Sequence, residues 1–374
     1  MLICNAVVFD GKEFHGDWRV RLEGGQVTGA GSGLPAAGGE EVLDLGGDYL
    51  LPGFVDVHIH ACAGMDTMRG EGDIRGMSRF LYTLGVAAFC PTTMSAATED
   101  VRRAMDAVRR VMREPEAEGA RVLGAHMEAP FLSAKHAGAQ RAEFFRDPDW
   151  DAFLEMAGDP FAVRLITLAP EREGSEAFIR KARAAGVRVS VGHTDASAEQ
   201  VHRAGDWGAD HITHTFNAQT PLHHRNPGVP GAALTDGRFF CEVICDGKHL
   251  HDDAVRLLVR CAGAGRAVAI TDAMEAAGMP DGEYALGGQK VIVRDEAARL
   301  EDGTLAGSVL TMPRALENLI LRCGIAPETA CAMCTSTPAE SVGENEAGRI
   351  RPGSPAPLTR WSRDWRMAGV VTGR

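Results

Sequence analysis

Histidine and acidic side chains recur along this chain at the ends of short apolar runs. In chain order they are His58, His60, Glu128, His193, His214 and Asp272. Neutral imidazole and carboxylate are the ligands that zinc and neighbouring transition metals take from proteins. A divalent ion held this way activates water, so the pattern predicts a metal-dependent hydrolase.

The first pair, His58 and His60, stands two residues apart, so on a strand both imidazoles point to the same face. They form a ready pair of metal ligands, and two hydrogen-bonded core histidines are the alternative. Glu128 ends an apolar run, where a carboxylate is costly to bury unless it is paired or bound to metal. His126 shares the face of Glu128 and can be either a ligand or a packing residue.

Two later histidines occupy equivalent places. His193 closes the run 189–192 and His214 closes the run 211–213, and the repetition strengthens both as ligands. Asp272 follows the run 268–271, where an aspartate can take a proton from the activated water and return it to a leaving group. A helix N-cap is the alternative for Asp272.

The elements that must position these groups alternate between strand and helix. Helical stretches such as Val101–Arg113 and Glu176–Ala185 separate runs of eight predicted strands, the number that a closed parallel barrel needs. The predicted strands are 54–58, 87–90, 122–126, 163–168, 187–191, 211–214, 240–244 and 268–271. The predicted fold class is α/β, a TIM-like (β/α)8 barrel whose reactive groups gather at the C-terminal strand ends.

The two ends of the chain lack the alternation of strand and helix. Short β-type runs separated by glycine turns fill residues 1–50, and similar pieces return after Gly348. We therefore expect residues 1–50 plus 345–374 to form a small β-sandwich domain and residues 51–344 to form the barrel.

Composition excludes several classes of function. The net charge of −12 over 374 residues argues against nucleic-acid binding. No apolar stretch approaches the roughly 20 residues of a membrane span, and the N-terminus lacks the pattern of a signal peptide. Nine cysteines scattered through apolar contexts are typical of a reducing compartment, so a cytoplasmic location is expected.

Eight motifs together carry a family resemblance. They are Pro52–His60, His126–Phe131, Leu168–Glu171, Gly192–Asp195, Thr213–Ala218, Asp246–His249, Thr271–Met274 and Leu305–Ser308. With these motifs, in this order, the chain resembles the amidohydrolase superfamily and, within it, the N-acetylglucosamine-6-phosphate deacetylase family. The resemblance runs from about residue 50 to residue 310. It implies a metal-dependent barrel flanked by a small β-sandwich.

The resemblance also implies a metal arrangement. Glu128, His193 and His214 would hold one divalent ion, zinc or iron. His58 and His60 would allow a second ion, bridged to the first through Glu128.

The implied reaction is hydrolysis of the acetamide of N-acetylglucosamine 6-phosphate, a small-molecule substrate, to glucosamine 6-phosphate and acetate. Asp272 would move the proton and His249 would polarise the carbonyl oxygen, in a protein that the resemblance makes a homodimer. The implied substrate contacts are Asn217, the backbone of Ala218, Arg225, His249, Gln140, Leu305 and Gly307.

Some positions depart from the family pattern. The family has glycine where this chain has Ala61 and Ala129, and methionine where it has Gln219. Gln140 stands where the family places a histidine that reaches the substrate phosphate of a neighbouring subunit, and glutamine cannot become cationic.

Two rival classes of protein are the alternatives to this family. One is another metal amidohydrolase. It could be a sibling that deacetylates another N-acetyl hexosamine (phosphate) or N-acyl substrate, a dihydroorotase-like cyclic amidase or an N-acyl amino-acid deacylase. The other is a non-catalytic barrel, which predicts the loss of a metal ligand or of Asp272, and every one of these residues is present.

Overall fold

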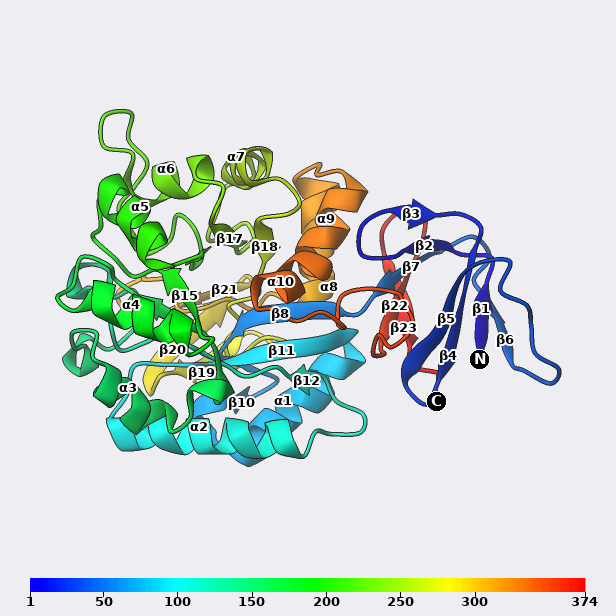
Figure 1. The fold of residues 1–374 in the computed structure, drawn as a ribbon, viewed down its shortest axis with the longest axis horizontal. Helices are drawn as coiled ribbons and strands as arrows, with labels where there is room; N and C mark the ends of the chain where they lie inside the picture. The colour runs from blue at the N-terminus through cyan, green and yellow to red at the C-terminus, as the bar shows by residue number, and fades with distance from the viewer. Residues whose placement is uncertain (374) are drawn as a thin grey trace.

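The computed structural model describes residues 1–373 as a parallel barrel with a β-sandwich at one side (Figure 1). Neighbouring strands of the barrel pair in parallel, so the predicted barrel is confirmed. The strands are β8 (Phe54–Ile59), β11 (Val86–Thr93), β12 (Arg121–Val122), β13 (Ala125–Met127), β14 (Val163–Leu168), β15 (Arg188–Val191), β16 (His211–Ile212), β17 (Phe240–Val243) and β18 (Ala267–Ala269). β12 and β13 are two parts of the third predicted strand, interrupted at Gly124, which has φ +138°.

Helices cover the outside of the barrel (Figure 1). The helices are α1 (Glu71–Thr83), α2 (Thr98–Arg113), α3 (Trp150–Ala157), α4 (Ser175–Ala184), α5 (Ala198–Trp207), α6 (Gly228–Thr235), α7 (Asp252–Ala262), α8 (Met312–Glu317), α9 (Pro327–Cys334) and α10 (Ser336–Ser341). Within residues 1–373, every helix is too short or too polar to cross a membrane.

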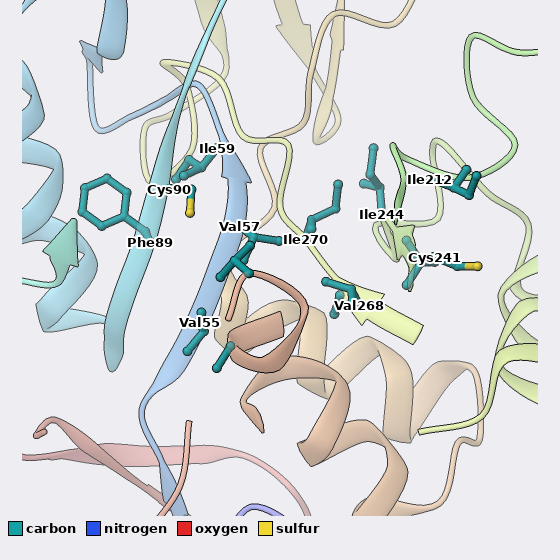
Figure 2. Close-up of a cluster of buried hydrophobic side chains, with 14 of the residues drawn as sticks. Val55, Val57, Ile59, Phe89, Cys90, Ile212, Cys241, Ile244, Val268 and Ile270 are labelled. Atoms are coloured by element: carbon teal, nitrogen blue, oxygen red, sulfur yellow. The ribbon is translucent and has the colours of Figure 1, made fainter. Parts of the chain in front are cut away.

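The two faces of β8 have different roles, because one packs against helices and the other carries residues of the predicted site. Alternate side chains point to opposite faces, and Val55 and Val57 pack outward beside α9 and α10 (Figure 2). Asp56 and His58 therefore point into the barrel, where both are fully buried. The apolar residues, which predicted the strand in the sequence, thus pack against the helices. The polar residues between them face the predicted site.

The seam between the last and first barrel strands is closed at the C-terminal end. The Asp272 N–H donates to the His58 carbonyl (2.8 Å), and the His60 N–H donates to the Ala273 carbonyl (3.0 Å). Deeper in the barrel, the Thr271 hydroxyl donates to the Asp56 carboxyl group (2.5 Å). The residues that close the barrel are therefore those of the predicted site and their direct neighbours.

Strands from both ends of the chain build the sandwich. One sheet has the order β5–β4–β1–β6 and the other β23–β22–β7–β2–β3, with an apolar core shared by both. The strands are β1 (Leu2–Cys4), β2 (Val7–Phe9), β3 (Phe14–His15), β4 (Trp18–Glu23), β5 (Gln26–Ser32), β6 (Val42–Asp44), β7 (Tyr49–Pro52), β22 (Leu358–Trp361) and β23 (Met367–Val371). The fold class is thus confirmed, while the boundaries at 50/51 and 344/345 stay a prediction.

One element was not expected from the sequence. Between β18 and α8 the chain forms an antiparallel sheet of β19 (Gly282–Leu286), β20 (Gln289–Arg294) and β21 (Ala297–Arg299). Its apolar side packs on Met94 and Met274 near the C-terminal end of the barrel. This insertion adds a wall to the site described next.

A short hairpin of β9 (Ala61–Cys62) and β10 (Met65–Asp66) follows β8.

Candidate active site

A pocket of about 340 Å³ opens where the barrel strands end. Most of the residues expected at the site lie in its wall, together with Leu286 of the inserted sheet. The expected residues that line it are His60, Glu128, Gln140, His193, His214, Asn217, Ala218, His249, Asp272, Leu305 and Gly307. His58 lies beneath them, fully buried.

Three of the expected metal ligands converge on one point. His193 Nε2 lies 3.2 Å and His214 Nε2 lies 3.1 Å from Glu128 Oε1. The two imidazole nitrogens lie 3.1 Å from each other. Glu128, His193 and His214 come from three strand ends, so the barrel, and no local turn, brings this set together.

The remaining expected ligands stand beside the first set. His60 Nε2 lies 3.2 Å from Glu128 Oε2, and His58 Nε2 lies 3.4 Å from Glu128 Oε1. Asp272 Oδ1 lies 3.3 Å from His60 Nε2 and 3.5 Å from His58 Nε2. Glu128 therefore faces both groups of histidines, as a bridging carboxylate must.

The imidazoles of the four predicted histidine ligands are each oriented by a contact at Nδ1, the nitrogen that faces away from the centre. In every case Nδ1 meets an oxygen acceptor, which fixes the ring and leaves Nε2 facing the centre. The pairs are His58 with Glu242 Oε2 (3.0 Å), His60 with Thr92 O (3.3 Å), His193 with His136 O (2.8 Å) and His214 with Asn217 O (3.2 Å).

This donor set fits a divalent metal. With Nδ1 protonated, His193 and His214 aim lone pairs at the same point, an arrangement that a cation stabilises. His58 Nε2 is buried without a hydrogen-bond partner. Burial lowers the pKa of His60, but Asp272 and Glu128 raise it by more, to about 9. The carboxylates therefore favour positive charge at the centre, which a bound dication supplies.

Both acidic groups are carboxylates in this setting. Burial raises the pKa of Glu128, but His58, His193 and His214 lower it by more, and the net pKa lies well below its ordinary value. Burial also raises the pKa of Asp272, and His58 and His60 more than offset this. Glu128 can thus bind metal and Asp272 can accept a proton at neutral pH.

The backbone at three of these residues is strained. His193 (φ +46°), His214 (φ +28°) and Asp272 (φ +48°) all lie in the left-handed region, which non-glycine residues rarely adopt. Such strain of roughly 1–3 kcal/mol per residue clusters at functional sites. Here it turns each side chain from the end of its strand toward the pocket.

His249 is oriented to act on a substrate. Its Nδ1 meets Asp246 Oδ2 at 2.7 Å, which leaves Nε2 for the pocket. Burial lowers the pKa of His249, but the hydrogen bond and charge of Asp246 raise it by more. The protonated ring is favoured, and its Nε2–H can donate to a carbonyl oxygen.

Gln140 is hydrogen-bonded at both ends of its side-chain amide. It is buried, its Nε2 donates to Glu128 Oε2 (2.5 Å), and its Oε1 accepts from the Ser95 N–H (2.7 Å). Both ends of the amide are thus engaged within the chain, one of them by the predicted bridging carboxylate. Gln140 also lines the pocket, and its role in substrate binding stays a prediction.

Arg225 lies away from the pocket of its own chain. It is exposed in the loop before α6, which projects from the barrel in Figure 1, and its Nη1 lies 2.7 Å from His224 Nε2. Arg225 is not among the residues that line the pocket, and its contact with a substrate phosphate stays a prediction.

Apart from His126, sequence reasoning missed a layer of polar groups under the predicted metal ligands. His126 Nε2 bonds the Thr167 hydroxyl (2.7 Å), which bonds Thr213 (2.7 Å), which in turn bonds Ser190 (2.5 Å). Glu242, whose carboxylate meets His58, belongs to the same layer. A charged residue within the apolar run 240–244 was the available signal, because a buried carboxylate needs a partner.

Comparison with known proteins gives a consistent picture. The model of the amidohydrolase family matches residues 49–371. The N-acetylglucosamine-6-phosphate deacetylase of Vibrio furnissii is 36% identical over 376 residues, covering 98% of this chain and 92% of that protein. The N-acetylgalactosamine-6-phosphate deacetylase of Escherichia coli O157:H7 is 36% identical over 318 residues, covering 84% of each chain.

A solved structure agrees over the whole chain. It is a mutant N-acetyl-D-glucosamine-6-phosphate deacetylase from Mycobacterium smegmatis in complex with N-acetyl-D-glucosamine-6-phosphate. Its TM-score is 0.91 at 30% sequence identity, covering 100% of this chain and 98% of that one. The likeness includes both the barrel and the sandwich.

Proposed function

Because the chain belongs to the amidohydrolase family, we propose that it hydrolyses the acetamide of N-acetylglucosamine 6-phosphate to glucosamine 6-phosphate and acetate. The observation that carries this proposal is the convergence of Glu128, His193 and His214 beside Asp272 in one pocket. Relatives that share the reaction resemble the chain along nearly all its length.

The residues that would hold the main ion are Glu128, His193 and His214, and His58 with His60 would hold a second. Zinc and iron(II) both suit imidazole and carboxylate ligands. When bound, such an ion supplies Lewis-acid activation of the attacking water and of the acetamide carbonyl.

The chain's own groups then handle the protons. Asp272 Oδ1, close to His58 and His60, is placed to accept the proton of the attacking water. His249 Nε2–H donates to the carbonyl oxygen as negative charge develops there. Asp272 returns its proton to the nitrogen as the C–N bond breaks, which releases a neutral amine and acetic acid. The acid then gives its remaining proton to the amine, so that acetate and the ammonium form of the amino sugar leave.

Arg225 supports recognition of a phosphate by a homodimer. The side chain is exposed on a projecting loop and is not among the residues that line the pocket described above. A guanidinium matches a phosphate bidentately, so a second copy can supply the cation that the pocket of each chain needs. A cytoplasmic location is consistent with nine free cysteines.

The test is a panel of N-acetylated sugars assayed for acetate release. It includes N-acetylglucosamine, N-acetylgalactosamine and their 6-phosphates, each with metal-loaded and chelator-treated protein. We expect the highest kcat/KM for N-acetylglucosamine 6-phosphate and loss of turnover after chelation. Preference for the galactosamine epimer would favour the activity of the Escherichia coli relative, and preference for unphosphorylated sugars would contradict the phosphate assignment.

A further inference from the structure

Glu242 is a buried carboxylate with no part in the proposed reaction. It lies on β17 between Cys241 and Val243, which pack into the apolar core. Its side chain is fully buried, and Oε1 has no hydrogen-bond partner. Burying a carboxylate with one oxygen unpaired destabilises a fold relative to an apolar residue of similar size. Packing alone therefore does not account for this residue.

The other oxygen joins two predicted metal ligands. Glu242 Oε2 accepts from His58 Nδ1 (3.0 Å) and from the backbone N–H of His214 (3.0 Å). His58 belongs to the second set of ligands, and His214 belongs to the first. One carboxylate oxygen thus fixes a ring on β8 and the strained backbone beyond β16.

His58 differs from the other three imidazoles in this respect. His60, His193 and His214 are held at Nδ1 by backbone carbonyls, whereas His58 is held by a carboxylate. Both kinds of acceptor fix the tautomer, and a carboxylate also makes the opposite nitrogen a stronger donor to metal. His58 Nε2, which faces Glu128 and Asp272, gains this effect.

We propose that Glu242 is a positioning residue for a second divalent ion, held by His58, His60 and Glu128. The proposal rests on the metal centre of the proposed function. Glu242 sets the direction and basicity of His58, and through the backbone of His214 it ties the geometry of this ion to that of the main one. It does not touch the substrate.

The test compares Glu242→Gln with wild type by metal content and zinc affinity. Zinc is titrated into metal-free protein against a chromogenic chelator, and bound ions per chain are counted by elemental analysis. We expect two ions in wild type. In Glu242→Gln the second ion should bind 10–100-fold more weakly, the range for loss of such an outer partner, while the first ion keeps its affinity.

Three variants sharpen the result. Ser190→Ala, a matched change in the same buried layer that touches no ligand, should bind both ions as wild type does. His58→Asn should lose the second ion directly. The double variant Glu242→Gln/His58→Asn should be no worse than His58→Asn alone, because Glu242 acts through that ring.

Several outcomes overturn the proposal. These are a single ion in wild type, wild-type affinity for the second ion in Glu242→Gln, or an equal loss of both ions. If the glutamine variant does not fold, Glu242→Asp keeps the charge and loses the reach to His58, so it should weaken the second ion more than the first. Nitrogen NMR of zinc-loaded wild type gives a readout without any variant at position 242. A His58 ring protonated at Nε2 contradicts the proposal.

Acetate release is measured separately from metal binding. Wild type that binds two ions and cleaves no N-acetyl sugar phosphate would therefore refute the proposed function and leave the role of Glu242 standing.

Discussion

Asp272 is held in place by its backbone on both sides. Its N–H donates to the His58 carbonyl and its own carbonyl accepts from Ser308, each at 2.8 Å. The left-handed conformation then turns the carboxylate toward the histidines. A residue fixed this way can be changed in charge with little change in shape, which makes it a good site for a test.

Replacing Asp272 by asparagine should remove the proton acceptor and leave the fold intact. General acid–base groups contribute about 10²–10⁴-fold to rate, so we expect kcat to fall by that range with thermal stability and main-site metal content near wild type. Acetate release and elemental analysis check the two halves. Asp151→Asn, an exposed change on α3, is the control, and a near wild-type rate for Asp272→Asn would show that another group takes the proton.

Replacing Arg225 by alanine should act on substrate binding. A hydrogen bond to a charged group contributes roughly 1.5–3 kcal/mol, so KM for the phosphorylated sugar should rise about tenfold or more. The unphosphorylated sugar should be unaffected. Steady-state kinetics on both substrates give the comparison, with Arg203→Ala on α5 as an exposed control. An equal effect on the two substrates would remove Arg225 from the phosphate site.

At the scale of elements, Asp210 joins a helix to two barrel strands at the end remote from the pocket. Its carboxylate meets Arg183 of α4 (3.1 Å), Arg188 of β15 (2.5 Å) and His211 of β16 (2.8 Å). Burial raises the pKa of Asp210, but His211 and the two arginines lower it by more. The folded state therefore binds the proton less readily than the unfolded chain.

The sign of this shift gives a pH prediction. The stabilisation from Asp210 is complete above the unfolded pKa of about 3.9 and is lost as pH falls through the lower folded pKa. We expect Asp210→Asn to lower the free energy of unfolding by roughly 1–3 kcal/mol at pH 7, with a smaller deficit near pH 3. Denaturant unfolding of metal-free protein checks this without the ion's own pH dependence. A deficit that does not change with pH would contradict it.

The elements also show what the sequence could and could not predict. The strands were recognisable because residues such as Val55 and Val57 form an apolar outward face. The sheet β19–β21 was missed, although Gly287 and Gly288, at φ +56° and +78°, form a hairpin turn of a kind readable from sequence.

The hydrogen-bond partners of buried polar groups could not be predicted from the sequence, because they lie far apart along the chain. Glu242 meets His58 across 184 residues, and no local pattern encodes that pairing. The predicted metal ligands could be proposed from the sequence because they lie at or near strand ends, and all strands of a parallel barrel end at one face. The contact of Gln140 with Glu128 could not be predicted, because it depends on how the loop after β13 folds back.

At the scale of the whole molecule, one tryptophan connects the sandwich to the barrel. Trp361 of β22 is fully buried and packs edge-on against Phe54 of β8, with ring centroids 6.2 Å apart. β8 carries His58, so the sandwich supports the strand that bears the first predicted ligands.

Trp361→Ala should destabilise the protein by roughly 3–5 kcal/mol, the usual cost of removing a large buried aromatic side chain. The reaction chemistry does not involve this residue, so kcat per folded molecule should stay near wild type. Urea unfolding and activity at a temperature where both proteins are folded measure the two quantities. Trp18→Ala, a partly exposed tryptophan of the sandwich, should cost less. A large fall in kcat for Trp361→Ala would mean that the sandwich also shapes the site.

The sandwich has a consequence for how the protein is made. β22 pairs with β7, and Arg360 reaches Asp48 across 312 residues. A ribosome therefore releases β2 and β7 long before the strand that covers the edge of β7 exists. An uncovered strand edge is a template for pairing with other chains, and nascent chains fold from the N-terminus onward. Until synthesis reaches β22, the nascent chain carries an unpaired strand edge on β7. The yield of folded protein in cells therefore depends on whether a chaperone or the ribosome covers this edge before β22 is made.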